Sequence, residues 1–242
     1  MCYYISITQK PSDVQIRFGA LFKQPESFKP AYSVNAFSYP LIPIINNEKP
    51  DSVDLYEWGL IPFWVKDIES ANKIRQRTLN ARAETIFEKP SFRHSIMAKR
   101  CLIIADGFFE WRHENKKAYP YYIKLRKGKS FAIAGIWDAW TNPETNEELR
   151  TFSVVTTVAN NLLEKIHNTR KRMPVILPEK KEKEWLNMNL SKEEIAFFLV
   201  PYDEREMDAY TVPNAMNKMG YNTDNPEVLV EYEYSDLPQL DI

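Results

Sequence analysis

Short apolar runs, rich in β-branched and aromatic residues, recur along the middle of the chain and constrain its fold more than any other feature. The run at 100–105 is almost continuously apolar, which is typical of a buried strand. Similar runs follow at 108–112, 121–125, 131–137 and 151–157, with a turn-forming stretch at 141–146. Because helices do not alternate with these runs, the pattern predicts an α+β fold whose core is a mostly antiparallel β-sheet or distorted β-barrel with flanking helices.

The remaining segments are read in the same way. Ser191 with Glu194 three residues later predicts a helix with a capping box, and Ser91 predicts a helix N-cap. Strands are predicted at 41–45, 54–61, 173–177 and 211–212, and helices at 160–166, 182–187 and 191–199. Residues 68–79 are expected to form a short helix or an ordered loop. We expect one domain over residues 1–242, with an acidic, loosely packed tail from about residue 222.

Composition excludes several classes of protein. The six glycines disfavour Gly-rich phosphate loops, and no apolar run approaches the roughly 18 residues of a membrane helix. The first residues lack the basic and apolar regions of a secretory signal, so we expect a cytoplasmic protein with no membrane partner. Cys2 and Cys101 are then expected to stay reduced, and with only three histidines the cysteines lack zinc-site spacing, so no structural metal is expected.

Charge is unevenly distributed although the net charge is only −1. Residues 73–100 hold eight basic side chains against two acidic ones, and a second basic cluster lies at 165–172. From residue 201 onward there are ten acidic residues against two basic ones. The asymmetry has two interpretations, which are ordinary solvated surface or a basic groove for phosphates with an acidic tail lying elsewhere.

Cys2 directly follows the initiator methionine, whose removal would leave an N-terminal cysteine. Such a residue carries a free α-amine and a thiol with ordinary pKa values of about 7.7–8.0 and about 8.5, so both are partly nucleophilic near neutrality. A 1,2-aminothiol reacts specifically with aldehydes, because the amine forms a Schiff base and the thiol then closes a thiazolidine ring. On position alone, a chance cysteine at residue 2 remains the simpler interpretation.

Three other polar side chains lie within apolar segments. Glu110 lies between aromatic residues, where desolvation raises a carboxyl pKa and suits the group to proton transfer near pH 7. His167 follows an apolar, helix-like stretch, and Asn80 offers both a donor and an acceptor. The structural alternatives are an arginine-paired glutamate, a satisfied core histidine and a turn or capping asparagine.

Taken together, these motifs resemble the SOS response-associated peptidase (SRAP) family, also described as abasic-site processing proteins. Five ordered motifs are far more specific than any one of them. They are Cys2, residues 58–64 (WGLIPFW), residues 80–84 (NARAE), residues 100–111 (RCLIIADGFFEW) and His167 before Arg172-Met173-Pro174. The resemblance covers residues 2 to about 178.

The resemblance implies a reaction and its residues. Cys2 would attack the open-chain aldehyde of an abasic site in single-stranded DNA and form a thiazolidine crosslink, and Cys2 with Glu110 would serve autoproteolytic removal of Met1. Asn80 would hold the N-terminus and the sugar oxygen, Glu110 would move protons, and His167 would favour the ring-opened aldehyde.

The resemblance also implies how DNA is held. Arg82 and Arg172 would bind flanking phosphates, and Trp58 or Trp64 would stack on a base or wall the pocket. It further implies a protein without a cofactor that acts as a monomer and is nucleoid-associated when bound to DNA.

Three segments depart from the family pattern. Tyr3-Tyr4 stands where the family usually has Gly-Arg, which removes a flexible residue and a charge beside the nucleophile. Residues 32–37 only approximate the usual Tyr-Asn-x-x-Pro-Thr motif. Residues 168–171 lengthen the spacing between His167 and Arg172, and either widen the DNA contact or displace the histidine.

Two alternative functions remain. One is an N-terminal-nucleophile cysteine peptidase or amidohydrolase, in which Cys2 attacks a carbonyl with its own amine as base. The other is a noncovalent single-strand binding protein, in which Cys2 takes no part. The arginine-rich middle favours the crosslinking protein over the amidohydrolase, since amide hydrolysis needs no phosphate groove.

Overall fold

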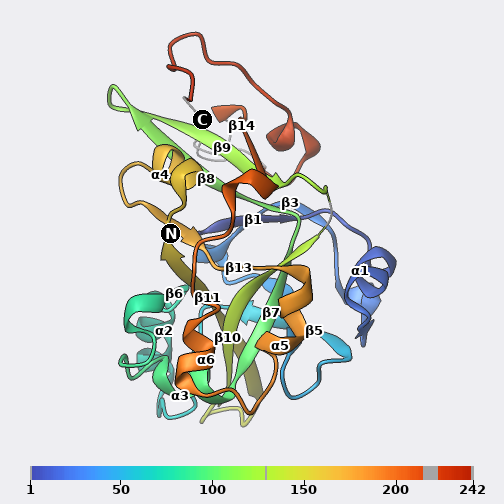
Figure 1. Cartoon of the computed structure of the whole chain (residues 1–242). Coiled ribbons are helices and arrows are strands. Elements are labelled where there is room, and N and C mark those ends of the chain that lie inside the picture. Colours follow the sequence, from blue (N-terminus) through green and yellow to red (C-terminus); the bar gives the residue numbers. More distant parts are fainter. Residues whose placement is uncertain (1, 129, 215–222, 241–242) are drawn as a thin grey trace.

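The computed structural model describes residues 2–128, 130–214 and 223–240. Figure 1 shows a small sheet in the upper half of the molecule and barrel-forming strands below it, with short helices outside both. The predicted α+β fold with a mostly antiparallel, barrel-like core is confirmed. None of the helices in these residues combines the length and apolar character needed to span a membrane.

Five strands of the larger sheet close into a barrel. They are β5 (Ser52–Trp58), β4 (Leu41–Asn46), β7 (Arg100–Ala105), β10 (Phe131–Thr141) and β11 (Glu148–Val158), paired antiparallel in that order. The ring closes because β11 also pairs parallel with β5, with Phe152 opposite Trp58. Attached to it are β2 (Leu21–Phe22), β6 (Asn80–Arg82), β12 (Arg172–Pro174) and β13 (Ile176–Leu177). The apolar runs of β7 and β10 are buried along their whole length, apart from the last residues of β10, so they form the core of the barrel.

The small sheet carries the N-terminal end of the described chain. Its strand order is β14 (Met207–Thr211), β9 (Lys117–Leu125), β8 (Gly107–Glu114), β1 (Tyr4–Ile7) and β3 (Ala31–Asn35). The sequence patterns did not predict β1 or β6, because segments of three or four residues are too short to show a period and become strands through their neighbours.

A corner at Asp106 joins β7 of the barrel to β8 of the small sheet. The Asp106 carboxylate accepts hydrogen bonds from the Thr8 hydroxyl at 2.9 Å and from the backbone N–H of Gln9 at 3.1 Å. At Gly107 a Cβ atom would lie 2.3 Å from the Tyr122 ring, so only glycine fits this approach. The corner fixes the end of β1 relative to the start of β8, and both strands lead to the site described below.

The helices are short and lie on the outside. They are α1 (Pro11–Phe18), α2 (Ile68–Arg75), α3 (Arg93–Ala98), α4 (Asn161–Ile166), α5 (Glu182–Trp185) and α6 (Lys192–Ala196), with 3-10 turns η1 (Pro25–Ser27), η2 (Ala36–Ser38), η3 (Ala83–Thr85), η4 (Glu179–Lys181), η5 (Glu204–Glu206) and η7 (Pro226–Leu229). The capping box at Ser191 and Glu194 is confirmed. The predicted cap at Ser91 is wrong, because α3 starts one residue later, after Phe92, whose side chain accepts no capping hydrogen bond.

Residue 222, where the acidic C-terminal segment was predicted to start, is not among the described residues. Residues 223–240 are described and lie against the small sheet. Val228 is fully buried, and the Tyr234 hydroxyl donates to the carbonyl of Val212 at 2.9 Å. Tyr234 also contacts Tyr119 of β9 edge to face. This segment therefore covers the outer side of β9 and β14.

Candidate active site at the N-terminal cysteine

Cys2 lies two residues before β1, next to the point where β1 pairs with β8. Tyr4 lies opposite Phe109, which brings Cys2 to the part of β8 that carries Glu110. The thiol is fully buried and its Sγ lies 3.9 Å from the carbonyl oxygen of Tyr4. Burial raises the pKa of the Cys2 thiol, and the nearby Glu110 carboxylate raises it further. The sulfur is therefore held as a neutral thiol that needs a neighbouring proton acceptor before it can attack.

Glu110 is that neighbour. Its side chain is 3% exposed, and burial raises the pKa of its carboxyl to about 8. The group therefore exchanges its proton close to neutral pH, which is the condition for acid–base catalysis there. The predicted desolvated carboxyl is present, and no arginine is among the groups that shift it.

His167 contacts Glu110 from the end of α4. Its Nδ1 lies 3.4 Å from the Glu110 Oε1 and 2.9 Å from the carbonyl oxygen of Arg172. Because a carbonyl only accepts, we assign the proton to Nδ1, which leaves Nε2 with a lone pair. Burial lowers the His167 pKa to about 4, so near pH 7 both partners are mostly uncharged and the contact is polar rather than ionic.

The longer segment after His167 does not displace it. The Asn168 side chain accepts from the backbone N–H of His113 at 3.0 Å and donates to the carbonyl of His113 at 2.7 Å. His113 lies on β8, three residues after Glu110. These two hydrogen bonds therefore hold the segment after His167 against the strand that carries the glutamate. The extra residues leave Arg170 exposed beside the site.

Asn80 and Arg82 lie on β6, a strand that pairs parallel with β11. Residues two apart on a strand share a face, so both side chains point the same way. Asn80 is buried, and neither its amide nitrogen nor its amide oxygen has a hydrogen-bond partner among the described residues. A buried unsatisfied polar group costs about 1–3 kcal/mol, so this amide is poised for a ligand. Arg82 is exposed at the end of the strand.

Arg172 lies between these groups but is already engaged. Its guanidinium forms an ion pair with Glu84 and donates to the carbonyl of Thr156 at 2.8 Å. Thr156 lies opposite Arg82 on β11, so Arg172 connects the His167 segment to β6. A phosphate would have to compete with Glu84 for this guanidinium.

The two tryptophans that were expected to stack on a base or wall the pocket, Trp58 and Trp64, lie in different environments. Trp58 is fully buried, donates from Nε1 to the carbonyl of Leu79 at 2.8 Å and stacks on Phe152. The expectation that Trp58 stacks on a base does not fit this position, because the indole is enclosed in the barrel core. The signal was available, since Tyr56 and Trp58 lie two apart and share the buried face of β5.

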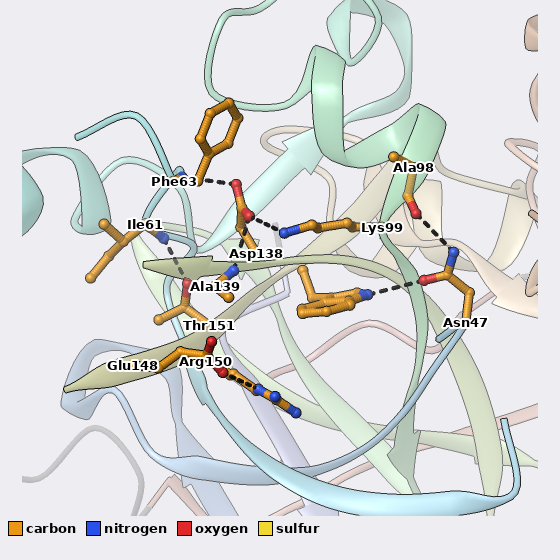
Figure 2. A network of polar contacts seen from close by, with 11 residues as sticks. Asn47, Ile61, Phe63, Ala98, Lys99, Asp138, Ala139, Glu148, Arg150 and Thr151 are labelled. Atoms are coloured by element: carbon orange, nitrogen blue, oxygen red, sulfur yellow. Dashed lines mark hydrogen bonds and ion pairs between the residues drawn. The ribbon is translucent and has the colours of Figure 1, made fainter. Parts of the chain in front are cut away.

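Trp64 is 43% exposed on a loop that is held by buried polar contacts. Figure 2 shows the backbone N–H of Phe63 donating to Asp138 at 2.9 Å and that of Ile61 donating to the Thr151 hydroxyl at 2.8 Å. Lys99 balances the Asp138 charge from 2.8 Å. A cavity of about 430 Å³ on this surface is lined by Phe63, Trp64, Pro90, Arg93 and His94. Trp64 is therefore available to a ligand.

The basic stretch at 73–100 is not one continuous groove. Arg100 is fully buried, and its guanidinium donates to the backbone carbonyls of Ile96 and Met97 at the end of α3. Lys73, Arg75 and Lys99 are each paired with a carboxylate. Besides Lys73, the exposed members are Arg77, Arg82, Lys89 and Arg93. No group of three metal-ligating side chains is found among the described residues.

The arrangement defines a class of protein, namely a barrel joined to a small sheet, with an enclosed cysteine at residue 2, a buried carboxyl in contact with an imidazole, and an unsatisfied amide on a strand attached to the barrel. The family model described as SOS response associated peptidase (SRAP) matches residues 1–219, and the chain belongs to this family.

Named relatives agree with the family assignment. The chain is 40% identical over 232 residues to the abasic site processing protein YoqW of Bacillus subtilis, covering 95% of this chain and 99% of that protein. It is 33% identical over 149 residues to the abasic site processing protein HMCES of Xenopus tropicalis, covering 54% of this chain and 43% of that protein. A crystal structure of a protein from Bacteroides thetaiotaomicron superimposes with a TM-score of 0.90 at 44% identity, covering 96% of this chain and all of that one.

Proposed function

We propose that this protein processes abasic sites by binding single-stranded DNA and forming a covalent thiazolidine crosslink through Cys2. The observation that carries the proposal is the enclosed Cys2 thiol beside Glu110, a carboxyl whose pKa of about 8 allows it to give and take protons at neutral pH. The names of the relatives, abasic site processing proteins, support the same substrate.

The reaction begins with exposure of the α-amine. We propose that the Cys2 thiol attacks the carbonyl carbon of Met1, that Glu110 carries the proton to the departing Cys2 nitrogen, and that water hydrolyses the resulting thioester to release methionine. The product is an N-terminal cysteine whose amine and thiol are both free.

Crosslinking then follows in two steps. The Cys2 amine adds to the aldehyde carbon of the ring-opened abasic sugar, and the carbinolamine loses water to give a Schiff base. The thiol sulfur adds to the same carbon, its proton passes by way of Glu110 to the nitrogen, and the five-membered ring closes. One water is lost overall, and the DNA backbone is not broken.

The surrounding residues have supporting roles in this proposal. Asn80 holds the N-terminus and a sugar oxygen, which would satisfy its buried amide. His167 is neutral at working pH, because its pKa is about 4, and its Nε2 accepts the proton of the sugar hydroxyl as the ring opens. Arg82 and Trp64 bind a phosphate and a base, and Arg172 binds a second phosphate if Glu84 yields it.

The test is an SDS-stable complex with a single-stranded oligonucleotide that carries one abasic site. Cys2→Ala should abolish the complex, and Cys101→Ala should keep it, because Cys101 is buried in β7. A stable N-terminal extension before Cys2 should also block it, because the α-amine is then an amide. Formation of the same complex with an undamaged strand would refute the aldehyde chemistry. Survival of the SDS-stable complex in Cys2→Ala would show that another residue forms the bond, and its absence in the wild type would leave only noncovalent binding.

A further inference from the structure

Two aromatic side chains form a contact beside Cys2 that the reaction above does not use. Tyr3 and Phe37, called here the aromatic pair, have ring centroids 4.7 Å apart at an angle of 36°. Phe37 is 55% exposed, and Tyr3 is half-buried. Tyr3 is also the residue at which this chain departs from the glycine that is usual in its family.

The backbone holds the aromatic pair in place. The N–H of Ala36 donates to the carbonyl of Tyr3 at 2.8 Å, and Asn35 lies opposite Tyr4 in the β1–β3 ladder. The Asn35 side chain in turn caps η2 by accepting from the N–H of Phe37 at 3.0 Å. The position of the rings is therefore set by β1 and η2, and an exposed, fixed aromatic surface of this kind is typical of a stacking site.

The charges around Tyr3 fit a nucleotide. Burial raises the pKa of the Tyr3 hydroxyl, and the charges of Arg170 and Arg82 lower it while that of Glu110 raises it, so both guanidiniums and the reactive carboxyl lie near this hydroxyl. Both arginines are exposed. An aromatic face next to free guanidinium groups is the combination that binds a base together with its phosphate.

We propose that the aromatic pair is a stacking subsite for the base next to the abasic sugar, and that Arg170 binds the phosphate of that nucleotide. This inference rests on the proposed function, because it places the neighbouring nucleotide relative to the aldehyde that Cys2 attacks. A purely structural role for the pair would bury Phe37, whose ring is instead mostly open to solvent.

The experiment measures single-turnover crosslinking at protein concentrations below saturation. The probes are single-stranded oligonucleotides with one abasic site whose neighbour, on the 5′ or the 3′ side, is adenine or a baseless tetrahydrofuran spacer. Stacking strengthens binding by roughly 5- to 150-fold per base, so on one side the spacer should slow the wild-type protein by an amount in this range.

The variants assign this effect to the aromatic pair. Tyr3→Gly and Phe37→Ala should react with adenine-flanked and spacer-flanked probes at nearly equal rates, and Tyr3→Trp should restore the preference. Phe197→Ala is the matched control, because Phe197 is 80% exposed on the unrelated α6 segment and should keep the wild-type preference. Arg170→Gln should weaken binding to adenine-flanked and spacer-flanked probes alike, with a shallower salt dependence.

Intact mass and thermal unfolding show that each variant has lost Met1 and is folded. The subsite is wrong if the wild type reacts equally fast with both probes, or if Tyr3→Gly and Phe37→Ala keep the full preference. Absence of any adduct in the wild type would overturn the proposed function itself, and the subsite with it.

Discussion

Replacing Glu110 with glutamine removes the buried carboxyl on which the proposed proton transfers depend, while keeping its shape. The pKa of Glu110 is raised from 4.5 to about 8 by burial, so the folded state holds a proton that the unfolded chain has already released. The stability that comes with a raised pKa is complete below pH 4.5 and is lost as the pH rises through 8. Wild-type protein should therefore lose stability relative to Glu110→Gln as the solution becomes more alkaline.

The size of this effect follows from the shift. At about 1.4 kcal/mol per pKa unit, the shift of Glu110 lowers the free energy of unfolding relative to low pH. The loss is under about 1 kcal/mol at pH 5, about 3 kcal/mol at pH 7 and about 4 kcal/mol at pH 8. The difference in free energy of unfolding between Glu110→Gln and wild type should thus grow by about 3 kcal/mol between pH 5 and pH 8.

Urea unfolding at four pH values between 5 and 8 measures this difference. Glu69→Gln serves as the control, because the Glu69 side chain is 78% exposed and its removal tests the loss of one surface carboxylate. Parallel stability curves for wild type and Glu110→Gln would refute the raised pKa. The same variant should crosslink about 100- to 10,000-fold more slowly, the usual contribution of acid–base catalysis.

Other variants separate structural from DNA-binding roles. Trp58→Ala should lower the free energy of unfolding by about 3–5 kcal/mol, whereas Trp64→Ala should leave urea unfolding unchanged and weaken single-strand binding by about 1–3 kcal/mol in fluorescence anisotropy; equal stability losses would contradict this. Arg82→Ala should reduce the slope of log affinity against log salt by about 0.7, and an unchanged slope would remove it from the phosphate contacts. Because the His167 pKa is about 4, wild-type crosslinking should show no inflection near pH 6.5, and one that disappears in His167→Gln would contradict the assigned neutral form.

The barrel could be predicted from the sequence because its strands are long and apolar. Strands β7 and β10 are buried on both sides, so their sequences are continuous apolar runs that are typical of buried strands. Strands β1 and β6, which carry the N-terminal and Asn80 sides of the site, have four and three residues. Their extended conformation is set by β8 and β11, and no local pattern encodes it.

The candidate site could be predicted only in part for a related reason. The aromatic neighbours of Glu110 correctly indicated a desolvated carboxyl, since the first four residues of β8, which end at Glu110, are all buried. The engagement of Arg172 by Glu84, and the pairing of Tyr3 with Phe37, join residues far apart in the chain. Such contacts depend on the closed barrel and its register, which sequence spacing does not contain.

The central claim concerns the chemistry of Cys2. Intact mass spectrometry of the purified protein, with and without a single-stranded oligonucleotide carrying one abasic site, tests it most directly. We predict a chain without Met1 and, after incubation, an adduct heavier by the mass of the oligonucleotide less one water, which is absent in Cys2→Ala. An unmodified mass after incubation, or an identical adduct in Cys2→Ala, would contradict the account.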